Sequence, residues 1–230
     1  MLAAAQTLSM DPYRASGASA SEIPMPYPYA DITFTPSVKA AQSDNGSREF
    51  CEHMSGNDRD FVLGPKEAAF VAAQDHFFMA TVSETGWPYV QHRGGPPGFV
   101  QVISERRFAF PDFRGNRQYI SVGNLARNER ASFFFIDYPN KARLKALATI
   151  TLRKAEDEPE VIERFAVLGY RAAIERVFVA DVAALDWNCP QHITPRFTAA
   201  ELTPVMGKLV DDLEALKAEN AALKARLAGA

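Results

Sequence analysis

The sequence predicts a mainly β protein with helices, an α+β fold in which antiparallel strands form a barrel between two extensions. Short strand-like segments recur at hairpin spacing through the middle of the chain, separated by turn residues, which is typical of antiparallel barrels. Hydrophobic residues make up 47% of the 230 residues and include 16 Phe, so the chain can fill a sizeable core. Beyond residue 198 the apolar pattern changes to a seven-residue repeat, which indicates a separate helix.

The first segment, residues 1–60, is predicted to be an extension that is partly irregular. Alanine, serine and proline dominate its composition, and four prolines prevent a long helix: Pro24, Pro26, Pro28 and Pro36. Apolar side chains among them can dock the extension on the body of the protein: Tyr27, Tyr29, Ile32 and Phe34. We therefore expect the extension to be partly packed rather than a free linker.

The barrel is predicted to span residues 61–195. It begins with a helix at Gly64 and Pro65, because proline suits the first turn of a helix and the alanines that follow favour its continuation. Period-two and continuous apolar patterns predict strands at residues 77–82, 87–93, 99–103, 107–110, 131–136, 144–152 and 176–182. Short helices are expected at residues 117–126 and 158–166. The aromatic run at residues 131–136 predicts a strand that is buried on both faces.

The last segment, residues 198–228, is predicted to be a helix that begins with a capping box of Thr198 and Glu201. One heptad position holds Leu202, Leu209, Leu216 and Leu223, and the other holds Met206, Leu213, Asn220 and Leu227. Leucine at d with a lone asparagine at a is the pattern of a parallel two-stranded coiled coil. In such a pair Asp212 faces Lys217 of the partner helix, and Glu219 faces Lys224. The alternative is an amphipathic helix packed on its own domain, which Val205 and Val210 favour for the first turns.

Charge and cysteine content exclude several classes of protein. The net charge of -3 and a pI of about 5.9 argue against non-specific nucleic-acid binding, which needs a basic surface. No run of eighteen apolar residues is present, so we expect no membrane-spanning helix, and the first residues lack the basic region of a signal peptide. Two cysteines, Cys51 and Cys189, do not make a disulfide framework. These features together predict a cytoplasmic protein.

Two glycine-bearing loops carry the most informative residues of the chain, at 91–98 and 110–118. Each loop places an arginine directly after a strand-like run, and loops from neighbouring strands can converge on one flat, anionic ligand. Arginine side chains and backbone N–H groups suit a phosphate, and the glycines let a planar ring approach the main chain. Asn116, Arg117 and Gln118 are expected at the start of a helix, where free N–H groups and the helix dipole attract an anion.

Other interpretations of these loops stay open from the residues alone. The sequence Gly94 to Gly98 is neither a dinucleotide fingerprint, because its two prolines remove N–H donors, nor a Walker A loop, because no Gly-Lys-Ser/Thr follows. It can be a rigid hairpin loop without a ligand, although Arg93 at a strand end must be solvated or paired. Asp112 to Gln118 can likewise be an ordinary helix cap with solvated charges.

The two loops resemble those of the pyridoxamine 5'-phosphate oxidase-like flavoproteins. The resemblance is carried by Trp-Pro-Tyr-Val-Gln-His-Arg-Gly-Gly-Pro-Pro-Gly-Phe at 87–99 and Phe-Ala-Phe-Pro-Asp-Phe-Arg-Gly-Asn-Arg-Gln-Tyr-Ile-Ser at 108–121. It covers about residues 61–182, with a further match at 186–193, and is closest to the branch that shares the Arg-Gly-Gly-Pro-Pro-Gly loop. This resemblance implies an FMN-binding split β-barrel that works as a homodimer.

The resemblance also implies which residues contact FMN. Gln91, His92, Arg93, Gly94 and Gly95 match the strand beside the flavin, and Phe110, Pro111 and Asp112 match the strand end under the ring and ribityl chain. Asn116, Arg117 and Gln118 match the phosphate-binding residues, with Gln118 in place of a lysine. Arg143 lies near a position that reaches the flavin from the other subunit, and its alternative is a solvated strand residue. The substrate side is expected to be lined by Trp187, Cys189, Gln191 and His192, of which Trp187 and Gln191 are also assigned to the cofactor.

These assignments imply a flavoprotein, and the expected activity is FMN-dependent oxidoreduction of an unidentified small molecule. No catalytic residue is assigned, because the flavin itself transfers the hydride. The Arg and Trp pattern by which the vitamin B6 oxidases recognise their substrate is not evident, so pyridoxamine phosphate is not supported as the substrate. Cys189 and His192 are too few to specify a metal site. The alternative is a non-enzymatic flavin or haem binding or sensor protein, with His192 as the axial ligand of a haem.

Overall fold

The computed structural model describes residues 29–53, 62–166, 169–187 and 189–229. It divides into two compact units, which are considered separately. The first unit contains the sheet and most of the helices, and the second consists of Asp137–Lys141 and Pro190–Ala230. Among the described residues no helix is both long enough and apolar enough to cross a membrane.

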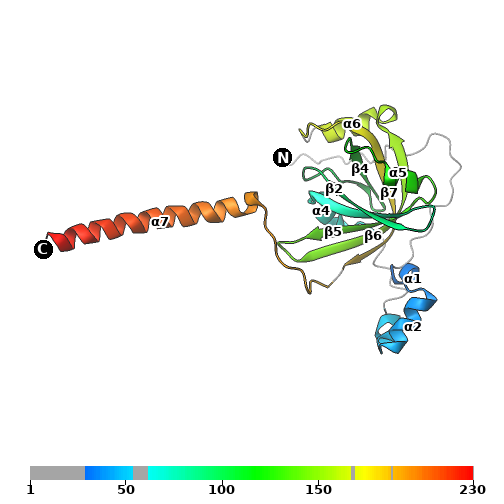
Figure 1. Cartoon of the computed structure of the whole chain (residues 1–230), viewed down its shortest axis with the longest axis horizontal. Helices are drawn as coiled ribbons and strands as arrows, with labels where there is room; N and C mark the ends of the chain where they lie inside the picture. The colour runs from blue at the N-terminus through cyan, green and yellow to red at the C-terminus, as the bar shows by residue number, and fades with distance from the viewer. Residues whose placement is uncertain (1–28, 54–61, 167–168, 188, 230) are drawn as a thin grey trace, which may run out of the picture. The chain divides into compact units, whose positions relative to one another are not determined.

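The first unit is built on one seven-stranded antiparallel sheet that curves around a shared core (Figure 1). The strands follow the order β2-β1-β5-β6-β7-β4-β3 across the sheet. Their bounds are β1 His76–Val82, β2 Pro88–Gly94, β3 Gln101–Ser104, β4 Arg107–Phe113, β5 Arg130–Asp137, β6 Ala142–Lys154 and β7 Ile174–Trp187. The predicted antiparallel split barrel with helices is therefore confirmed.

The alternating burial of side chains along β1 shows which side chains of its partner strand β2 face inward. Strand β1 buries Phe77, Met79 and Thr81, and it pairs with β2 over its whole length. Directly opposite residues of an antiparallel pair share a face of the sheet. Since Phe77 lies opposite Arg93, Met79 opposite Gln91 and Thr81 opposite Tyr89, these three side chains of β2 point to the inner side.

Phenylalanine side chains are the largest fully buried members of the core. Seven are almost fully buried: Phe77, Phe99, Phe108, Phe110, Phe133, Phe135 and Phe178. The rings of Phe110 and Phe178 stack with their centroids 4.9 Å apart, and this contact joins β4 to β7. The register of β4 on β7 shifts between Asp112 and Phe113, so β4 ends at an irregularity and leads directly into the loop at 114–119.

Two long strands extend beyond the ranges that the sequence predicts. Strand β7 was expected at 176–182 but runs from Ile174 to Trp187, and β6 runs from Ala142 to Lys154 rather than from 144 to 152. Charged residues that interrupt the apolar pattern are paired across the sheet, because Asp181 accepts from Arg107 at 2.7 Å and Asp186 accepts from Lys145 at 3.1 Å. For β7, the pairing of Asp186 lets the strand continue past residue 182, where the hydrophobicity pattern marks its end.

The prediction that the aromatic strand is buried on both faces is only partly correct. In β5 the side chains of Ala131, Phe133 and Phe135 are buried, whereas Ser132 and Phe134 are half-buried. The strand therefore alternates from Ala131 to Phe135, with one face in the core and the other partly exposed, and Ile136 at its end is buried as well.

The described part of the extension that precedes the barrel, residues 29–53, contains three short helices, α1 Tyr29–Thr33, α2 Pro36–Asp44 and α3 Arg48–Glu52. Pro36 does not interrupt α2 but occupies its first turn, where its missing N–H is not needed, and the Thr35 side chain accepts from the N–H of Val38. The expected docking is confirmed for Tyr29, because α1 contacts β7 and the Lys145 ammonium lies 5.3 Å from the centre of the Tyr29 ring. Pro24, Pro26, Pro28 and Tyr27 lie outside the described residues.

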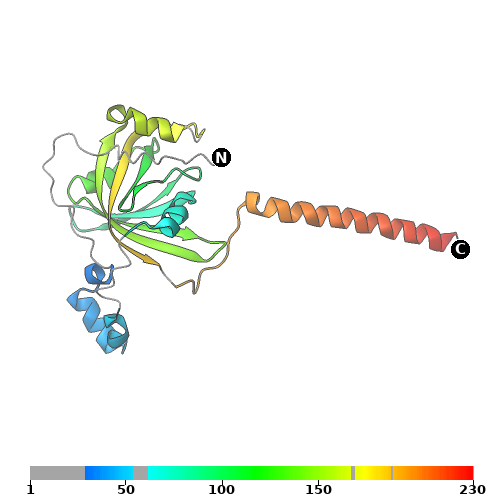
Figure 2. The same ribbon diagram turned by 180° about the vertical axis from the view of Figure 1, so that it is seen from behind.

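Three further helices belong to the first unit: α4 Pro65–Ala72, α5 Ile120–Leu125 and α6 Pro159–Ala166, with a short 3-10 turn at Ala155–Asp157 before α6. Helix α4, which is cyan and seen clearly from behind in Figure 2, packs on the end of β7 through Phe70 and Trp187, whose ring centroids are 4.8 Å apart. Helix α5 is held to β1 by the Asn124 side chain, which donates to the hydroxyl of Thr81 at 3.0 Å.

The second unit contains α7, which runs from Ala199 to Ala228 and follows the predicted helix closely. The predicted capping box is present. The backbone N–H of Thr198 donates to the Glu201 carboxylate at 2.7 Å, and the backbone N–H of Glu201 donates to the Thr198 hydroxyl at 3.2 Å. No residue of α7 is buried within the described part of the chain.

Candidate functional site

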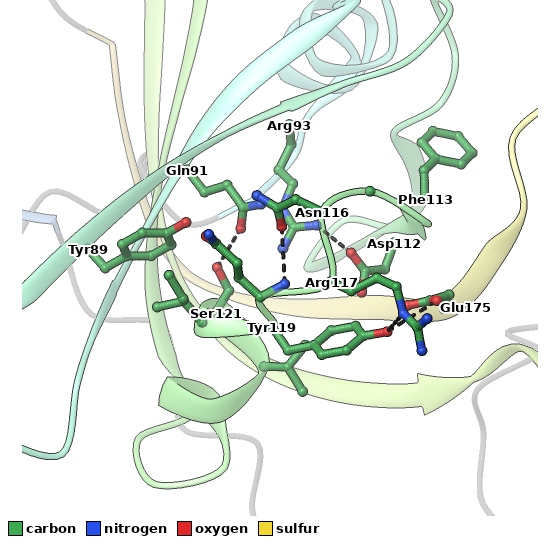
Figure 3. A pocket seen from close by; sticks show the side chains of 14 residues that line it. Tyr89, Gln91, Arg93, Asp112, Phe113, Asn116, Arg117, Tyr119, Ser121 and Glu175 are labelled. Atoms are coloured by element: carbon green, nitrogen blue, oxygen red, sulfur yellow. Dashed lines mark hydrogen bonds and ion pairs between the residues drawn. The ribbon is translucent and has the colours of Figure 1, made fainter.

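A cleft of about 150 Å³ opens where the inner side of β2 meets the end of β4, the loop at 114–119 and the start of α5 (Figure 3). The two loops that the sequence singles out therefore do contribute to one site. The cleft is lined by Tyr89, Gln91, Arg93, Asp112, Phe113, Gly115, Asn116, Arg117, Gln118, Tyr119, Ile120, Ser121, Val122 and Glu175.

Asp112 joins two arginines at the floor of the cleft. Its carboxylate accepts from Arg93 at 2.5 Å and from Arg176 at 2.7 Å, and its side chain is only 9% exposed. Arg176 reaches it from β7, where it lies directly opposite Asp112 in the register of the two strands. The Arg93 guanidinium also lies 4.8 Å from the centre of the Phe178 ring. Because the carboxylate is almost buried, this network fixes the orientation of both guanidinium groups.

Glu175 forms a second acidic centre at the edge of the same cleft. It accepts from Arg114 at 3.0 Å and from the Tyr119 hydroxyl at 3.2 Å, and it lies 3.5 Å from Arg176. Desolvation acts to raise the pKa of Glu175, but the hydrogen bonds from Tyr119 and Arg114 and the charges of Arg176 and Arg114 outweigh it and lower that pKa. The Glu175 carboxylate therefore holds the loop at 114–119 against β7.

Arg117 differs from the other arginines of the site. It is exposed at the mouth of the cleft, and its Nε donates to the Tyr119 hydroxyl at 3.2 Å. Arg93, Arg114 and Arg176 each pair with Asp112 or Glu175, whereas no carboxylate within 4.0 Å of Arg117 occurs among the described residues. The charged residues that line the cleft balance, with Arg93 and Arg117 against Asp112 and Glu175. Arg114 and Arg176, which bind these carboxylates from beside the cleft, bring the whole cluster to two net positive charges.

The loop that carries Arg117 is not the helix start that the sequence predicts. Helix α5 begins only at Ile120, and both Arg117, with φ of 60°, and Tyr119, with φ of 53°, adopt left-handed backbone conformations. The Asn116 side chain accepts from the backbone N–H of Gln118 at 3.1 Å, which stabilises a turn in place of helix. Asn116, Arg117 and Gln118 do line the cleft, but they lie in a loop before a helix of only six residues.

Gln91 is held by a contact that sequence reasoning did not foresee. The hydroxyl of Ser121, which is 2% exposed, donates to the Gln91 side-chain oxygen at 2.8 Å. This bond uses the amide oxygen and leaves the amide N–H groups of Gln91 as donors toward the cleft. Sequence reasoning also missed Tyr89, Tyr119, Glu175 and Arg176. The last two lie at the start of a strand that was predicted too short, and the pairing of β4 with β7 is what brings them to the site.

Several residues that the sequence assigns to the flavin do not line this cleft. His92 points to the opposite face of β2, where its ring stacks on His76 at 5.5 Å. Phe110 and Pro111 are buried in the sheet, and neither Gly94 nor Gly95 reaches the cleft. A Cβ on Gly95 would come within 2.6 Å of the Phe99 ring, so close packing against the core accounts for this glycine without a ligand.

The three remaining assigned residues are Trp187, Arg143 and Gln191. The Trp187 indole donates to Glu67 of α4 at 2.7 Å, and the Lys66 ammonium lies 4.2 Å from its ring centre, so this side chain is held against α4. Arg143 lies on β6, and its Nε is buried without a hydrogen-bond partner among the described residues. Gln191 belongs to the second unit. The assignment of these residues to FMN stays a prediction.

Comparison with known proteins supports the resemblance that the two loops suggest. The family model described as pyridoxamine 5'-phosphate oxidase matches residues 63–183, and a search of curated proteins gives no significant match. A HupZ structure from Group A Streptococcus matches with 15% identity and a TM-score of 0.44, over 58% of this chain and 99% of that one. A putative pyridoxamine 5'-phosphate oxidase from Lactobacillus delbrueckii matches with 14% identity and a TM-score of 0.41, over 55% of this chain and 98% of that one. An FMN-binding protein from Syntrophomonas wolfei matches with 12% identity and a TM-score of 0.41, over 64% of this chain and 97% of that one.

These structural similarities are low, so the assignment depends on the family model together with the two loops. The matched segment begins just before α4 and ends within β7, and it includes every strand that contributes to the cleft. Because this segment makes up more than half of the chain, the protein belongs to the pyridoxamine 5'-phosphate oxidase family.

Proposed function

We propose that the protein binds FMN in the cleft between β2, β4 and the loop at 114–119, and that it is an oxidoreductase acting on a small molecule. The observation that carries this proposal is Arg117, an exposed arginine at the mouth of the cleft. The charge of Glu175 acts on it, but no carboxylate among the described residues lies within 4.0 Å of its guanidinium group. An anionic group on the ligand is the natural partner for such a charge. Membership of the family, and the resemblance of both loops to flavin-binding loops, support FMN as that ligand.

The donor set of the cleft suits the phosphate of FMN. A phosphate monoester carries about -1.5 to -2 charges at neutral pH, which matches the two net positive charges of the whole cluster. In this proposal Arg117 binds the phosphate, together with the side chains of Asn116 and Gln118. The buried Nε of Arg93 lacks a partner in the described part of the chain, and it offers a further donor inside the cleft.

The remaining residues bind and orient the cofactor. Asp112 holds Arg93 and Arg176 in place, and Ser121 fixes Gln91 so that its amide N–H groups can donate to the edge of a flat ring. FMN, when bound, supplies the hydride-transfer chemistry, and the protein positions the ring and sets its electrostatic surroundings. In this proposal no side chain of the cleft acts as a general acid or base.

We also propose that a second copy of the chain completes the site. The cleft of about 150 Å³ is smaller than the roughly 300–1,000 Å³ of typical small-molecule sites, so one chain encloses only part of a cofactor. The outer face of β1, β2 and β5 presents apolar side chains that suit such a contact. Val90 is 61% exposed, Val82 is 39% exposed, and Phe78 lies opposite the half-buried Phe134. A homodimer that covers this face accounts for these side chains.

Binding of FMN and of riboflavin to the purified chain tests the proposed function. The two ligands differ only in the phosphate, so titration followed by flavin fluorescence isolates the contribution of the loop at 114–119 to the affinity for that phosphate. We expect a yellow protein that binds FMN more tightly than riboflavin. Equal affinities would refute the phosphate site. A haem Soret band in protein that does not take up FMN would instead favour the alternative of a haem-binding protein.

Reduction of the bound flavin then tests whether the protein is an enzyme. Candidate substrates are added without oxygen, and bleaching of the flavin absorbance is recorded. We expect at least one small molecule to bleach the flavin in the wild-type protein. A protein that binds FMN tightly, and whose flavin neither substrates nor nicotinamide cofactors reduce, would be a flavin-binding or sensor protein instead.

A further inference from the structure

Helix α7 exposes an uncovered row of large apolar side chains. The helix is 30 residues long, which corresponds to about 45 Å, and no residue of it is buried within the described part of the chain. The exposed fractions of its apolar side chains are 43% for Leu202, 58% for Val205, 55% for Met206, 56% for Leu209, 49% for Val210, 50% for Leu213, 62% for Leu216, 47% for Leu223 and 79% for Leu227. Exposed apolar surface of this extent usually marks an interface.

The apolar row is narrow and follows a heptad repeat. Between Leu209 and Leu227 every leucine falls at position a or d, and Asn220 occupies the remaining a position. The outward positions carry alanine, glycine or charged residues, among them Ala218, Ala221, Ala222 and Ala225. A stripe confined to a and d is too narrow for the face of a helix that packs on a globular domain, and it matches the seam of a coiled coil.

We propose that α7 pairs with α7 of a second copy of this chain as a parallel, two-stranded coiled coil from Met206 to Leu227. In that arrangement Asn220 lies opposite Asn220 of the partner subunit, where the two amides can hydrogen-bond within the seam. A single asparagine at an a position is a known determinant of two-stranded, in-register pairing. The inference concerns assembly, and it is independent of the proposed FMN site.

The charges that flank the seam select the parallel direction. In a parallel pair a g residue faces the e residue five positions later on the other helix, so Asp212 faces Lys217 and Glu219 faces Lys224. In an antiparallel pair g residues face g residues and e residues face e residues. That direction brings Asp212 and Glu219 together and places the lysines against one another, and it leaves Asn220 opposite a leucine.

Two valines flank the seam near the start of α7. Val205 occupies position g and Val210 occupies position e, and a parallel pair places them opposite each other. Their exposed fractions of 58% and 49% are those of uncovered side chains. The two valines, which taken alone favour packing on the same chain, are therefore equally consistent with the flank of an intermolecular seam. Pro204 lies just before Met206 and weakens the helix there, so we place the first paired a position at Met206, with the valines on its flank.

Position-dependent crosslinking of the full chain tests the proposal. In a background in which Cys51 and Cys189 are changed to serine, Asn220→Cys places the thiol in the seam and Ala218→Cys places it at the outward f position. Oxidation with glutathione disulfide is expected to link the Asn220→Cys chains into a covalent dimer at least tenfold faster than the Ala218→Cys chains. Equal rates would overturn the proposal, because two helices that are merely close would link at both positions.

Two double variants, each made in the Asn220→Cys background, distinguish loss of helix pairing from loss of folding. Leu216→Glu combined with Leu223→Glu places charges at two d positions, whereas Ala218→Glu combined with Ala225→Glu adds the same charges at f positions. The d pair should abolish disulfide linking of the Asn220→Cys chains and the f pair should preserve it, while both keep the native absorbance and unfolding of the barrel. If the d pair links as fast as the parent, the seam is not where the helices meet and the proposal fails.

Discussion

The variant Asp112→Asn tests whether the carboxylate at the floor of the cleft holds the two arginines. Asp112 is 9% exposed and bonds to Arg93 and Arg176, whose side chains are 11% and 21% exposed. The substitution keeps the shape of the side chain but removes its charge. It leaves two guanidinium groups near each other without their shared counter-charge, and it directs an amide N–H₂ group toward donors that cannot accept.

The structure sets the expected size of this effect. Removing one partner of a nearly buried charge pair costs about 3–5 kcal/mol of unfolding free energy. For a protein of this length each kcal/mol corresponds to about 2–4 °C, so the Tm measured by circular dichroism should fall by about 6–20 °C. Glu156→Gln serves as the matched control, because it removes an exposed carboxylate that pairs with Lys154 at 3.2 Å. Such surface pairs contribute only about 0–1 kcal/mol.

The comparison of the two variants decides the outcome. If Asp112→Asn lowers the Tm by no more than Glu156→Gln, then Asp112 does not hold the arginines in solution. The roles assigned to Arg93 and Arg176 in the cleft would then lose their structural basis. Near-ultraviolet circular dichroism of the folded variant checks that the aromatic core around Phe178 is retained.

Two other predictions concern the loop and the core beside it. Because the pKa of Glu175 lies below its ordinary value of 4.5, its stabilising effect should be present above about pH 4.5 and lost as the pH falls through the lowered pKa. Unfolding of wild type and Glu175→Gln across acid pH measures this, and parallel pH profiles would contradict it. Gly95→Ala should destabilise the fold by about 1–3 kcal/mol, since its Cβ meets Phe99 at 2.6 Å, whereas Gly123→Ala in α5, where a Cβ meets nothing within 4 Å, should stabilise it by up to about 1 kcal/mol. Denaturant unfolding of both glycine variants is the measurement, and an equal effect would contradict this account of Gly95.

The fold was predictable because its signals are local. Alternating residues such as Phe77 and Met79 indicate a strand whatever lies beside it, and the hairpin turns indicate antiparallel pairing. The end of β7 was not predictable in the same way. Asp186, which lies beyond the predicted end of the strand at residue 182, is compatible with a strand only because Lys145 lies across from it, and that partner is distant in the sequence. Patterns within one segment cannot reveal a pairing of this kind.

The candidate site also combines features that local sequence predicts with features that depend on distant residues. Arg93, Asp112 and Arg117 follow strand-like runs and were found from that context. Arg176, which binds Asp112, and Glu175, which holds Arg114 and Tyr119, come from β7, about sixty residues later. The left-handed conformations of Arg117 and Tyr119 were also missed, because neither residue is a glycine and both read as helix formers. Sequence reasoning therefore located the arginines of the cleft but not the network that orients them.

The central claim is that Arg117 binds the phosphate of FMN, and one set of dissociation constants tests it most directly. Flavin fluorescence gives the affinities of wild type and Arg117→Ala for FMN and for riboflavin, with Arg127→Ala, an exposed arginine outside the cleft, as the control. The account predicts that wild type and Arg127→Ala both prefer FMN, and that Arg117→Ala reduces this preference by about tenfold to a hundredfold without weakening riboflavin binding. A preference for FMN that survives Arg117→Ala unchanged would contradict the account.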